Sequence, residues 1–281
     1  MMRFLAIAAL CCAAAVMGSR PAEAVLVYNT NVTPGTNTEL ILGSGNANAA
    51  FTVDQANGVE LGLRGKLRFD ATNQPQNVFN YAGVSGAGHG VYTFSAVGVN
   101  PLNGPVPSWA NSTTPIWNFE WSVNSDYLGT ANRQLNDLTY GIYIDFNPAA
   151  ADVPNLSFDP INVTFADHSI GTNATGNGAG VEAVDAAGYA ALINANNIAQ
   201  QSWNMEFFDI PASLFPFDPT TVGTYTIRLD AYSGINLLAS TSIDVVTTAV
   251  PEASAFVFGS VVLGGVGAVV AYRKRQSKAT A

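Results

Sequence analysis

Apolar residues recur at every second position in several stretches of this chain of 281 residues. In "IWNFEWSV" (116–123), two tryptophans, a phenylalanine and a valine fall on one face, and polar residues occupy the positions between them. Successive side chains of a strand point to opposite faces, so this period predicts a strand with one face in a core. The stretches "VELGLRGKLRF" (59–69) and "LTYGIYIDF" (138–146) predict two more such strands.

Turn-forming residues divide the alternating stretches into short lengths. Clusters such as "GVSGAGHG" and "NPAAADVPN" separate them, and "GTYTIRLDAYSGINLLASTSIDVV" (223–246) is typical of a hairpin that turns at "SGIN". Four further stretches are predicted as strands: "FTV" (51–53), "VYTFSAV" (91–97), "INVTF" (161–165) and "WNMEFF" (203–208). The pattern predicts a mainly β fold, an antiparallel β-sandwich in one domain.

One stretch departs from the two-residue period. Residues 184–201, "VDAAGYAALINANNIAQQ", place Tyr189, Leu192 and Ile193 at helical spacing, and Asp185 stands where an N-terminal cap is expected. We therefore expect one inserted α-helix, lying against a sheet or across one end of the sandwich.

Residues 1–24 have the three parts of a secretory signal peptide: a basic start, an apolar run and a small-x-small cleavage site at Ala22 and Ala24. The apolar run is shorter than the roughly 20 residues that span a bilayer, which favours a signal over a retained anchor. We expect the mature chain to begin at Val25. Because Cys11 and Cys12 both lie in the signal, disulfides and thiolate metal sites are excluded from that mature chain.

A second apolar segment lies near the C-terminus. Residues 253–272 carry no charged side chain and are long enough for a transmembrane helix. Arg273, Lys274 and Arg275 follow directly, so the positive-inside rule places residues 273–281 in the cytoplasm and the preceding domain outside. The segment is either a permanent anchor or a signal that is read and removed.

The residues in front of this segment resemble a known sorting signal. Val250, Pro251, Glu252 and Ser254, followed by the apolar segment and the basic cluster, are similar to the PEP-CTERM family of tails, although Ala253 stands where that family usually has a second proline. The resemblance implies that an exosortase-type sorting enzyme, acting after the secretion machinery, recognises the tail of residues 250–281 and cleaves there.

The interval between the two terminal segments, residues 25–249, is predicted to be one extracytoplasmic domain. Its stretches "FTVDQANGVELGLRGKLRFD", "WNFEWSVNSD" and "GTYTIRLDAY" look similar to uncharacterised exported proteins that bear such tails. That resemblance implies a bacterial cell-surface protein associated with extracellular polysaccharide and the biofilm matrix. It implies no catalytic activity.

Charge narrows the classes of partner. Positions 25–250 hold five basic and eighteen acidic residues, a net charge of −13. Phosphate repulsion would oppose nucleic-acid binding by such a domain, whereas solubility outside the cell, cations and neutral glycans are compatible with it.

Catalytic motifs are weak throughout. Asp167 and His168 adjoin in "ADHSIG", but the nearest nucleophile elbow, "GVSGA", lacks its last glycine, and the glycine-rich "GAGHG" and "GNGAG" lack the residues of a phosphate-binding loop. Glu120 is the one acid that we considered for glycoside hydrolysis. We therefore assign no catalytic residue and no cofactor, and we interpret the chain as a structural or adhesive protein.

The alternative function is a carbohydrate- or calcium-binding module of the extracellular matrix. Asp145, Asn147 and Asp152 supply the hard oxygen ligands that suit Ca²⁺, although their spacing is not that of a calcium loop. An aromatic surface for sugar rings would come from four residues that are more typical of a core at strand spacing: Trp109, Trp117, Trp121 and Trp203.

Overall fold

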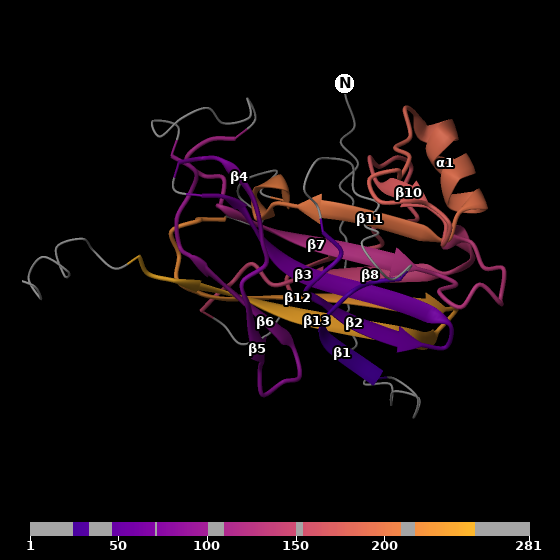
Figure 1. The fold of residues 1–281 in the computed structure, drawn as a ribbon, viewed down its shortest axis with the longest axis horizontal. Helices are drawn as coiled ribbons and strands as arrows, with labels where there is room; N and C mark the ends of the chain where they lie inside the picture. The colour runs from indigo at the N-terminus through magenta and orange to yellow at the C-terminus, as the bar shows by residue number, and fades with distance from the viewer. Residues whose placement is uncertain are drawn as a thin grey trace, which may run out of the picture.

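The computed structural model describes residues 25–33, 47–70, 72–100, 110–149, 154–208 and 217–250. Within these residues the chain is mainly β, with two stacked sheets and a single α-helix (Figure 1). The prediction of a mainly β, sandwich-like fold is confirmed. No helix in the described part of the chain is both long and apolar enough to cross a bilayer. The predicted signal of residues 1–24 and the predicted span of 253–272 both lie outside the described residues.

The first sheet, sheet A, has the strand order β1-β2-β3-β7-β11-β10, with β4 paired to the far end of β3. All of its pairs are antiparallel. Its strands are β1 (Val25–Thr30), β2 (Phe51–Ala56), β3 (Val59–Phe69), β4 (Pro75–Val78), β7 (Trp117–Asn124), β10 (Ser169–Gly171) and β11 (Ile198–Trp203).

The second sheet, sheet B, has the order β5-β6-β13-β12-β8-β9. Its strands are β5 (Tyr81–Val84), β6 (Gly90–Ser95), β8 (Thr139–Ile144), β9 (Leu156–Phe158), β12 (Gly223–Ser233) and β13 (Asn236–Thr248). β6 pairs with β13 in parallel, so sheet B is mixed and the prediction of a wholly antiparallel sandwich is wrong at this pair. The pair can be parallel because a long crossover, rather than a hairpin, separates the two strands in the chain.

The predicted hairpin is confirmed as β12 and β13. The two strands pair from Gly223 with Thr247 to Ser233 with Asn236, which leaves a two-residue turn. Gly234 has a φ of +58° at that turn, a conformation that glycine adopts without the steric penalty of a Cβ atom.

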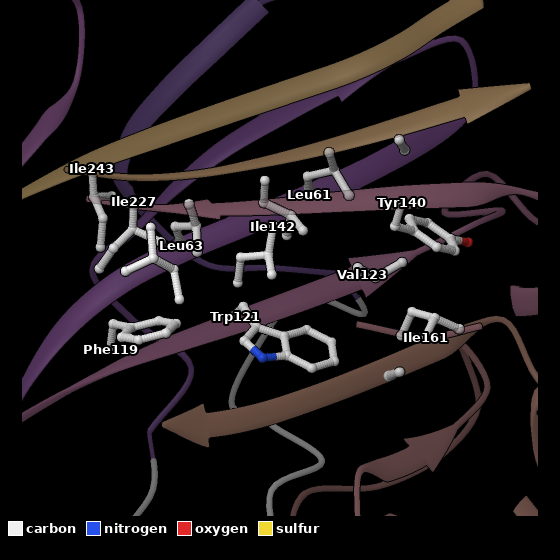
Figure 2. Packing of buried hydrophobic residues seen from close by; sticks show 14 of the residues in the cluster. Leu61, Leu63, Phe119, Trp121, Val123, Tyr140, Ile142, Ile161, Ile227 and Ile243 are labelled. Atoms are coloured by element: carbon white, nitrogen blue, oxygen red, sulfur yellow. The ribbon is translucent and has the colours of Figure 1, made fainter. Parts of the chain in front are cut away.

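The core lies between the two sheets and follows the predicted alternation. Trp117, Trp121 and the other apolar residues of β7 point inward with 0% exposure. Figure 2 shows Leu61, Leu63, Phe119 and Trp121 of sheet A facing Ile142, Ile227 and Ile243 of sheet B. The apolar face of each strand is thus buried against the other sheet, which is how a sandwich removes hydrophobic surface from water.

The predicted helix is shorter than its sequence range. Helix α1 spans Ala186–Ala195 beside β10 at one end of the sandwich, and Asp185 accepts a hydrogen bond from Gly188 N at 2.7 Å (Figure 1). Residues 198–201, also predicted helical, belong to strand β11 instead. The helix ends because Asn196 takes an extended conformation, after which Ile198 and Ala199 pair with β7.

Two predicted strands are wrong. Residues 161–165, "INVTF", form no regular element, because the Asp159 carboxylate accepts hydrogen bonds from Ile161 N and Asn162 N and holds the backbone in a turn. In "WNMEFF", only Trp203 belongs to a strand. The 3₁₀ helix η3 (Met205–Phe208) follows, and a second one, η2 (Leu135–Asp137), precedes β8.

Candidate functional site

The most unusual feature of the fold is a buried polar face. The side of sheet A that points away from the sandwich core carries alternate residues of β3 and β7, and we call it the outer face of sheet A. The alternation of the sequence leads one to expect solvent there, yet every residue of β7 is buried. The buried polar members on this face are Glu60, Arg64, Lys66, Asn118, Glu120, Ser122 and Asn124.

Three of these residues form an ionic cluster, which we define as Arg64, Lys66 and Glu120. Arg64 Nε donates to Glu120 Oε2 at 2.6 Å, and the Arg64 Nη2 atom forms an ion pair with the same oxygen. Lys66 Nζ donates to Glu120 Oε1 at 3.0 Å. The three side chains are at most 3% exposed, so the interactions act in a medium of low dielectric constant.

The chain that precedes β2 covers the cluster. Arg64 Nη1 donates to the carbonyl oxygens of Ala47 and Ala49 at 2.6 and 2.7 Å. The guanidinium carbon also lies 4.1 Å from the ring centroids of both Phe51 and Phe79. The guanidinium therefore has both hydrogen-bond and cation–π partners, a combination for which arginine is better suited than lysine.

Charge balance within the cluster keeps the carboxylate ionised. Burial acts to raise the pKa of Glu120, but the positive charges of Arg64 and Lys66 and their hydrogen bonds outweigh it, and the pKa lies below its ordinary value.

Carboxamides adjoin the ionic cluster. Asn118 lies directly opposite Lys66 in the β3–β7 register. Its Nδ2 donates to Ser202 Oγ at 3.1 Å, and its Oδ1 accepts from Asn204 Nδ2 at 3.3 Å. An amine, a carboxylate and an oriented carboxamide thus meet within one buried region. The crowded bases of "LRGKLRF" are a partial signal for this region in the sequence, but Glu120 is far from them in the chain.

A second polar cluster lies on the outer face of sheet B. His89 Nδ1 lies 3.0 Å from Asp244 Oδ1, which also accepts from Thr226 Oγ1 at 2.9 Å. Ser85 bonds the same carboxylate and accepts a hydrogen bond from His89 N. Burial acts to raise the pKa of Asp244, and these hydrogen bonds lower it to a greater extent.

This arrangement joins a serine, a histidine and an aspartate that sequence analysis did not bring together. Asp244 lies between Ser85 and His89, whereas in a catalytic relay the imidazole lies between the hydroxyl and the carboxylate. The "GAGHG" loop is a tight turn that closes on Ser85, with Gly88 N donating to Ser85 O at 3.0 Å. The contacts therefore fix the turn to β13.

The neighbouring pair Asp167 and His168 does not form such a set. His168 is 2% exposed and packs edge-on against Trp121 at a centroid distance of 4.9 Å. Its Nε2 lies 2.7 Å from Pro160 O, while Asp167 Oδ1 accepts from Gln201 Nε2 at 3.0 Å. His168 is thus a core residue, and burial lowers its pKa.

The calcium candidates form turns. Asp145 Oδ1 accepts from Asn147 N at 2.8 Å, and Asn147 Oδ1 accepts from Ala149 N at 3.2 Å. Asp152 lies outside the described residues. Among the residues that the structure describes, no three His, Cys, Asp or Glu side chains are placed to hold one metal ion.

The three tryptophans of the described residues lie in or against the core and form no surface for sugars. Trp117 and Trp121 are fully buried, Trp203 packs against the core, and Trp109 lies outside the described residues. Glu120, the acid considered for glycoside hydrolysis, belongs to the buried ionic cluster.

A partly exposed aromatic group occurs instead on the outer face of sheet B. The Arg228 guanidinium carbon lies 4.1 Å from the Tyr143 ring centroid, and the Tyr143 hydroxyl lies 3.5 Å from that of Tyr232. Arg228 also pairs with Asp230 at 3.2 Å, and its side chain is 43% exposed.

Only one residue of the predicted processing signals falls within the described part of the chain. Val250 is exposed and lies two residues after the end of β13. The other predicted residues, Pro251, Glu252, Ser254, Arg273, Lys274 and Arg275 of the tail and Ala22 and Ala24 of the signal, lie outside it.

Comparisons with known proteins add no relative: no protein-family model, no curated protein and no solved structure matches the chain.

Proposed function

We propose that the chain is an exported protein of the cell surface or extracellular matrix with a structural or adhesive role. In this proposal, its folded domain is delivered by the N-terminal signal and sorted by the C-terminal tail. An exosortase-type enzyme acts on Val250, Pro251 and Glu252 while residues 253–272 cross the membrane. The domain is then released or transferred to the outer surface.

The observation that carries the proposal is that every described strand lies between the two predicted segments. β1 begins at Val25, the first residue after the predicted cleavage site, and β13 ends at Thr248, just before Val250. Removal of both predicted segments would leave every strand of the two sheets intact.

The position of β13 supports a role in which the domain is held by its tail. β13 is an inner strand of sheet B, hydrogen-bonded to β12 on one side and to β6 on the other. A force applied at Val250 would act along β13 and would strain its hydrogen bonds to β12 and to β6 at the same time. Such an attachment resists force better than one at an edge strand, because an edge strand is hydrogen-bonded to a single neighbouring strand.

The test compares the full chain in two bacterial hosts that differ only in the presence of an exosortase. We expect a shorter form lacking the tail, in the external fraction, only in the host that has the enzyme. Pro251→Ala and Glu252→Ala together should abolish that form, and Asp218→Ala is the matched control in the folded domain. A full-length, membrane-associated chain in both hosts would contradict sorting and leave a permanent anchor.

A second candidate, binding of neutral polysaccharide, is favoured by the partly exposed Tyr143 and Arg228. Stacked aromatic and guanidinium planes beside the Tyr232 hydroxyl offer both a ring face and hydrogen bonds to a sugar. We expect retention of the full chain on immobilised neutral polysaccharide and loss of retention in Tyr143→Ala. Tyr127→Ala, at a partly exposed tyrosine in the turn after β7, should be retained as the wild type is. No retention of the wild type would eliminate this candidate.

A further inference from the structure

The outer face of sheet A places a lysine directly opposite an asparagine on two inner strands. Lys66 of β3 and Asn118 of β7 are register partners, and their neighbours on the same face are Arg64 and Glu120. Directly opposed residues of an antiparallel pair have Cβ atoms about 4.5–5.5 Å apart. The lysine chain is long enough to reach the carboxamide across that gap.

A carboxylate lies within proton-transfer distance of the lysine. Glu120 Oε1 is 3.0 Å from Lys66 Nζ, which is the range required of a general base. Arg64 binds the other carboxylate oxygen, so the Glu120 side chain is held in place by two contacts. Lys66 is 2% exposed and Glu120 is 0% exposed, which separates both groups from bulk water.

The carboxamide of Asn118 is oriented by two further polar side chains. Asn204 Nδ2 donates to Asn118 Oδ1 at 3.3 Å, the atom on which negative charge develops when a nucleophile adds to the carbonyl carbon. Ser202 Oγ accepts from Asn118 Nδ2 at 3.1 Å, next to the nitrogen that would leave. Both partners come from the chain at and just after the end of β11.

We propose that Lys66 and Asn118 form an intramolecular amide bond that links β3 to β7, with Glu120 as the proton carrier and Asn204 as the oxyanion donor. The structure assigns each side chain a role in one reaction, acyl transfer from an amide to an amine. The proposal is independent of whether the tail is processed. It also gives an exported domain that has no cysteine after Val25 a covalent cross-link of another kind.

The chemistry balances without an added oxidant, reductant or cofactor. Glu120 accepts a proton from the Lys66 ammonium, the neutral Nζ forms a bond to Asn118 Cγ, and the carbonyl electrons move to Oδ1. Glu120 delivers that proton to Nδ2 and then accepts a second proton from Nζ. The electrons on Oδ1 re-form the carbonyl as the Cγ–Nδ2 bond breaks, and the nitrogen leaves as ammonia, which takes the second proton from Glu120. The lysine ammonium and the carboxamide thereby become a secondary amide and one ammonium ion.

Burial and fixed orientation explain why the reaction would occur here and not in the unfolded chain. An amine and an amide in water do not react at neutral pH, whereas groups held in contact have effective concentrations far above those in solution. Lys66, Asn118 and Glu120 are at most 4% exposed, so water has little access to the reacting groups and hydrolysis competes poorly. We expect the cross-link to form only after β3 and β7 have paired.

The test is peptide mapping of the purified, folded full chain. The segment from Phe69 to Glu120 contains no other lysine, arginine or glutamate, so trypsin with a glutamate-specific protease should release it in one piece. We expect this peptide joined to Gly65–Arg68, with a mass below the sum of the two by one ammonia, about 17 Da. A peptide Gly65–Glu120 that trypsin has left uncut after Arg68 differs from the cross-linked product, because its mass is below the same sum by one water. Fragmentation of the peptide in the mass spectrometer locates the linkage.

Variants assign the roles. Lys66→Arg keeps a cation beside Glu120 but has no nucleophilic amine, and Glu120→Gln keeps the size but cannot carry the proton, so both should abolish the ammonia loss. Asn204→Ala should slow cross-linking when chain that has never folded is refolded from inclusion bodies. Ser122→Ala, on the same face, is the control that should form the cross-link at the wild-type rate.

The wild-type digest decides the proposal even if a variant fails to fold. Recovery of the unlinked Phe69–Glu120 peptide at its unmodified mass, together with cleavage after Lys66, would overturn it. Ammonia loss that persists in Lys66→Arg, with the variant folded by circular dichroism, would also overturn it.

Discussion

Arg64 Nε donates to Glu120 Oε2 at 2.6 Å from the neighbouring strand, and the two side chains are 0% and 1% exposed. Charges that are taken out of water stabilise a fold only when both partners are in place, because one buried charge left alone is strongly unfavourable. The buried pair therefore requires the chain that covers the outer face of sheet A. The carbonyl oxygens of Ala47 and Ala49 in that chain accept hydrogen bonds from the Arg64 guanidinium.

Arg64→Met is expected to lower the free energy of unfolding by about 3–5 kcal/mol, because it leaves a buried carboxylate without its main partner. Arg228→Met is the matched control, since the Arg228 side chain is 43% exposed and its pair with Asp230 should contribute at most about 1 kcal/mol. Urea denaturation of both variants and of the wild type measures the difference. Equal losses would show that burial of the Arg64 pair has no special weight.

Gly65→Ala should destabilise the sandwich by about 1–3 kcal/mol through overpacking. A Cβ atom at Gly65 would lie 2.7 Å from Tyr92 Cβ and 2.9 Å from Phe94 Cε2, both closer than normal contact. The control is Gly86→Ala in the turn before β6, where a Cβ meets nothing within 4 Å. Its effect is expected to be below about 1 kcal/mol. Thermal unfolding of the two variants checks the contrast, and a tolerated Gly65→Ala would mean that β6 can move away from β3.

Stability should fall as the pH is lowered through the titration range of His168. Burial lowers the pKa of this side chain, so the folded protein binds its proton less readily than the unfolded chain. The contribution to stability is complete above the ordinary histidine pKa of about 6.5 and is lost as the pH falls toward the lower pKa of the folded state.

The measurement for His168 is urea denaturation at pH 7.5 and pH 5.5, values set by that ordinary pKa of about 6.5. His168→Phe, which preserves an aromatic ring beside Trp121, should remove part of the pH dependence. The NMR titration of the His168 ring should give a midpoint below the ordinary value. A midpoint above it would contradict the assignment of His168 as a neutral core residue.

Asp185→Ala is expected to cost about 1 kcal/mol of stability by removing the N-terminal cap of α1. The carboxylate accepts from Gly188 N at 2.7 Å, and the helix rests its buried Tyr189 and Ile193 on the core. Glu182→Ala, at an exposed position just before the helix, should change stability by less than about 0.5 kcal/mol. Asp185→Asn, which retains the acceptor oxygen, should restore most of the loss, and failure to do so would point to charge rather than capping.

Patterns between residues that are near in the sequence predicted a strand, a hairpin turn and a helix cap correctly. The bounds of β3 match the predicted stretch, the hairpin of β12 and β13 turns where "SGIN" indicates, and Asp185 caps α1. The prediction of helix at residues 198–201 failed because they pair with β7, a non-local contact. Helix propensity is outweighed at these residues because pairing with β7 satisfies the backbone hydrogen-bonding groups and buries Ile198 at the same time. The prediction of a strand at residues 161–165 failed for a local reason, the turn held by the Asp159 carboxylate.

The candidate site could be predicted only in part. Alternation placed Asn118 and Glu120 on the same face of one strand, and the bases of "LRGKLRF" stood out in an acidic chain. That Lys66 lies opposite Asn118, and that Arg64 reaches Glu120, depends on the register of β3 against β7, which no local pattern specifies. The same holds for His89 and Asp244, which meet only because β6 pairs in parallel with β13.

By itself, the sequence determined which residues of each strand face the core, because the two-residue period is a property of the strand alone. It also determined the acidic charge of the domain and the absence of cysteine after Val25. Tertiary structure decided whether each polar face is buried or exposed to solvent. One of them became a buried cluster around Glu120, because a segment far away in the chain covers it, and solvent exposure is a property of the assembled fold.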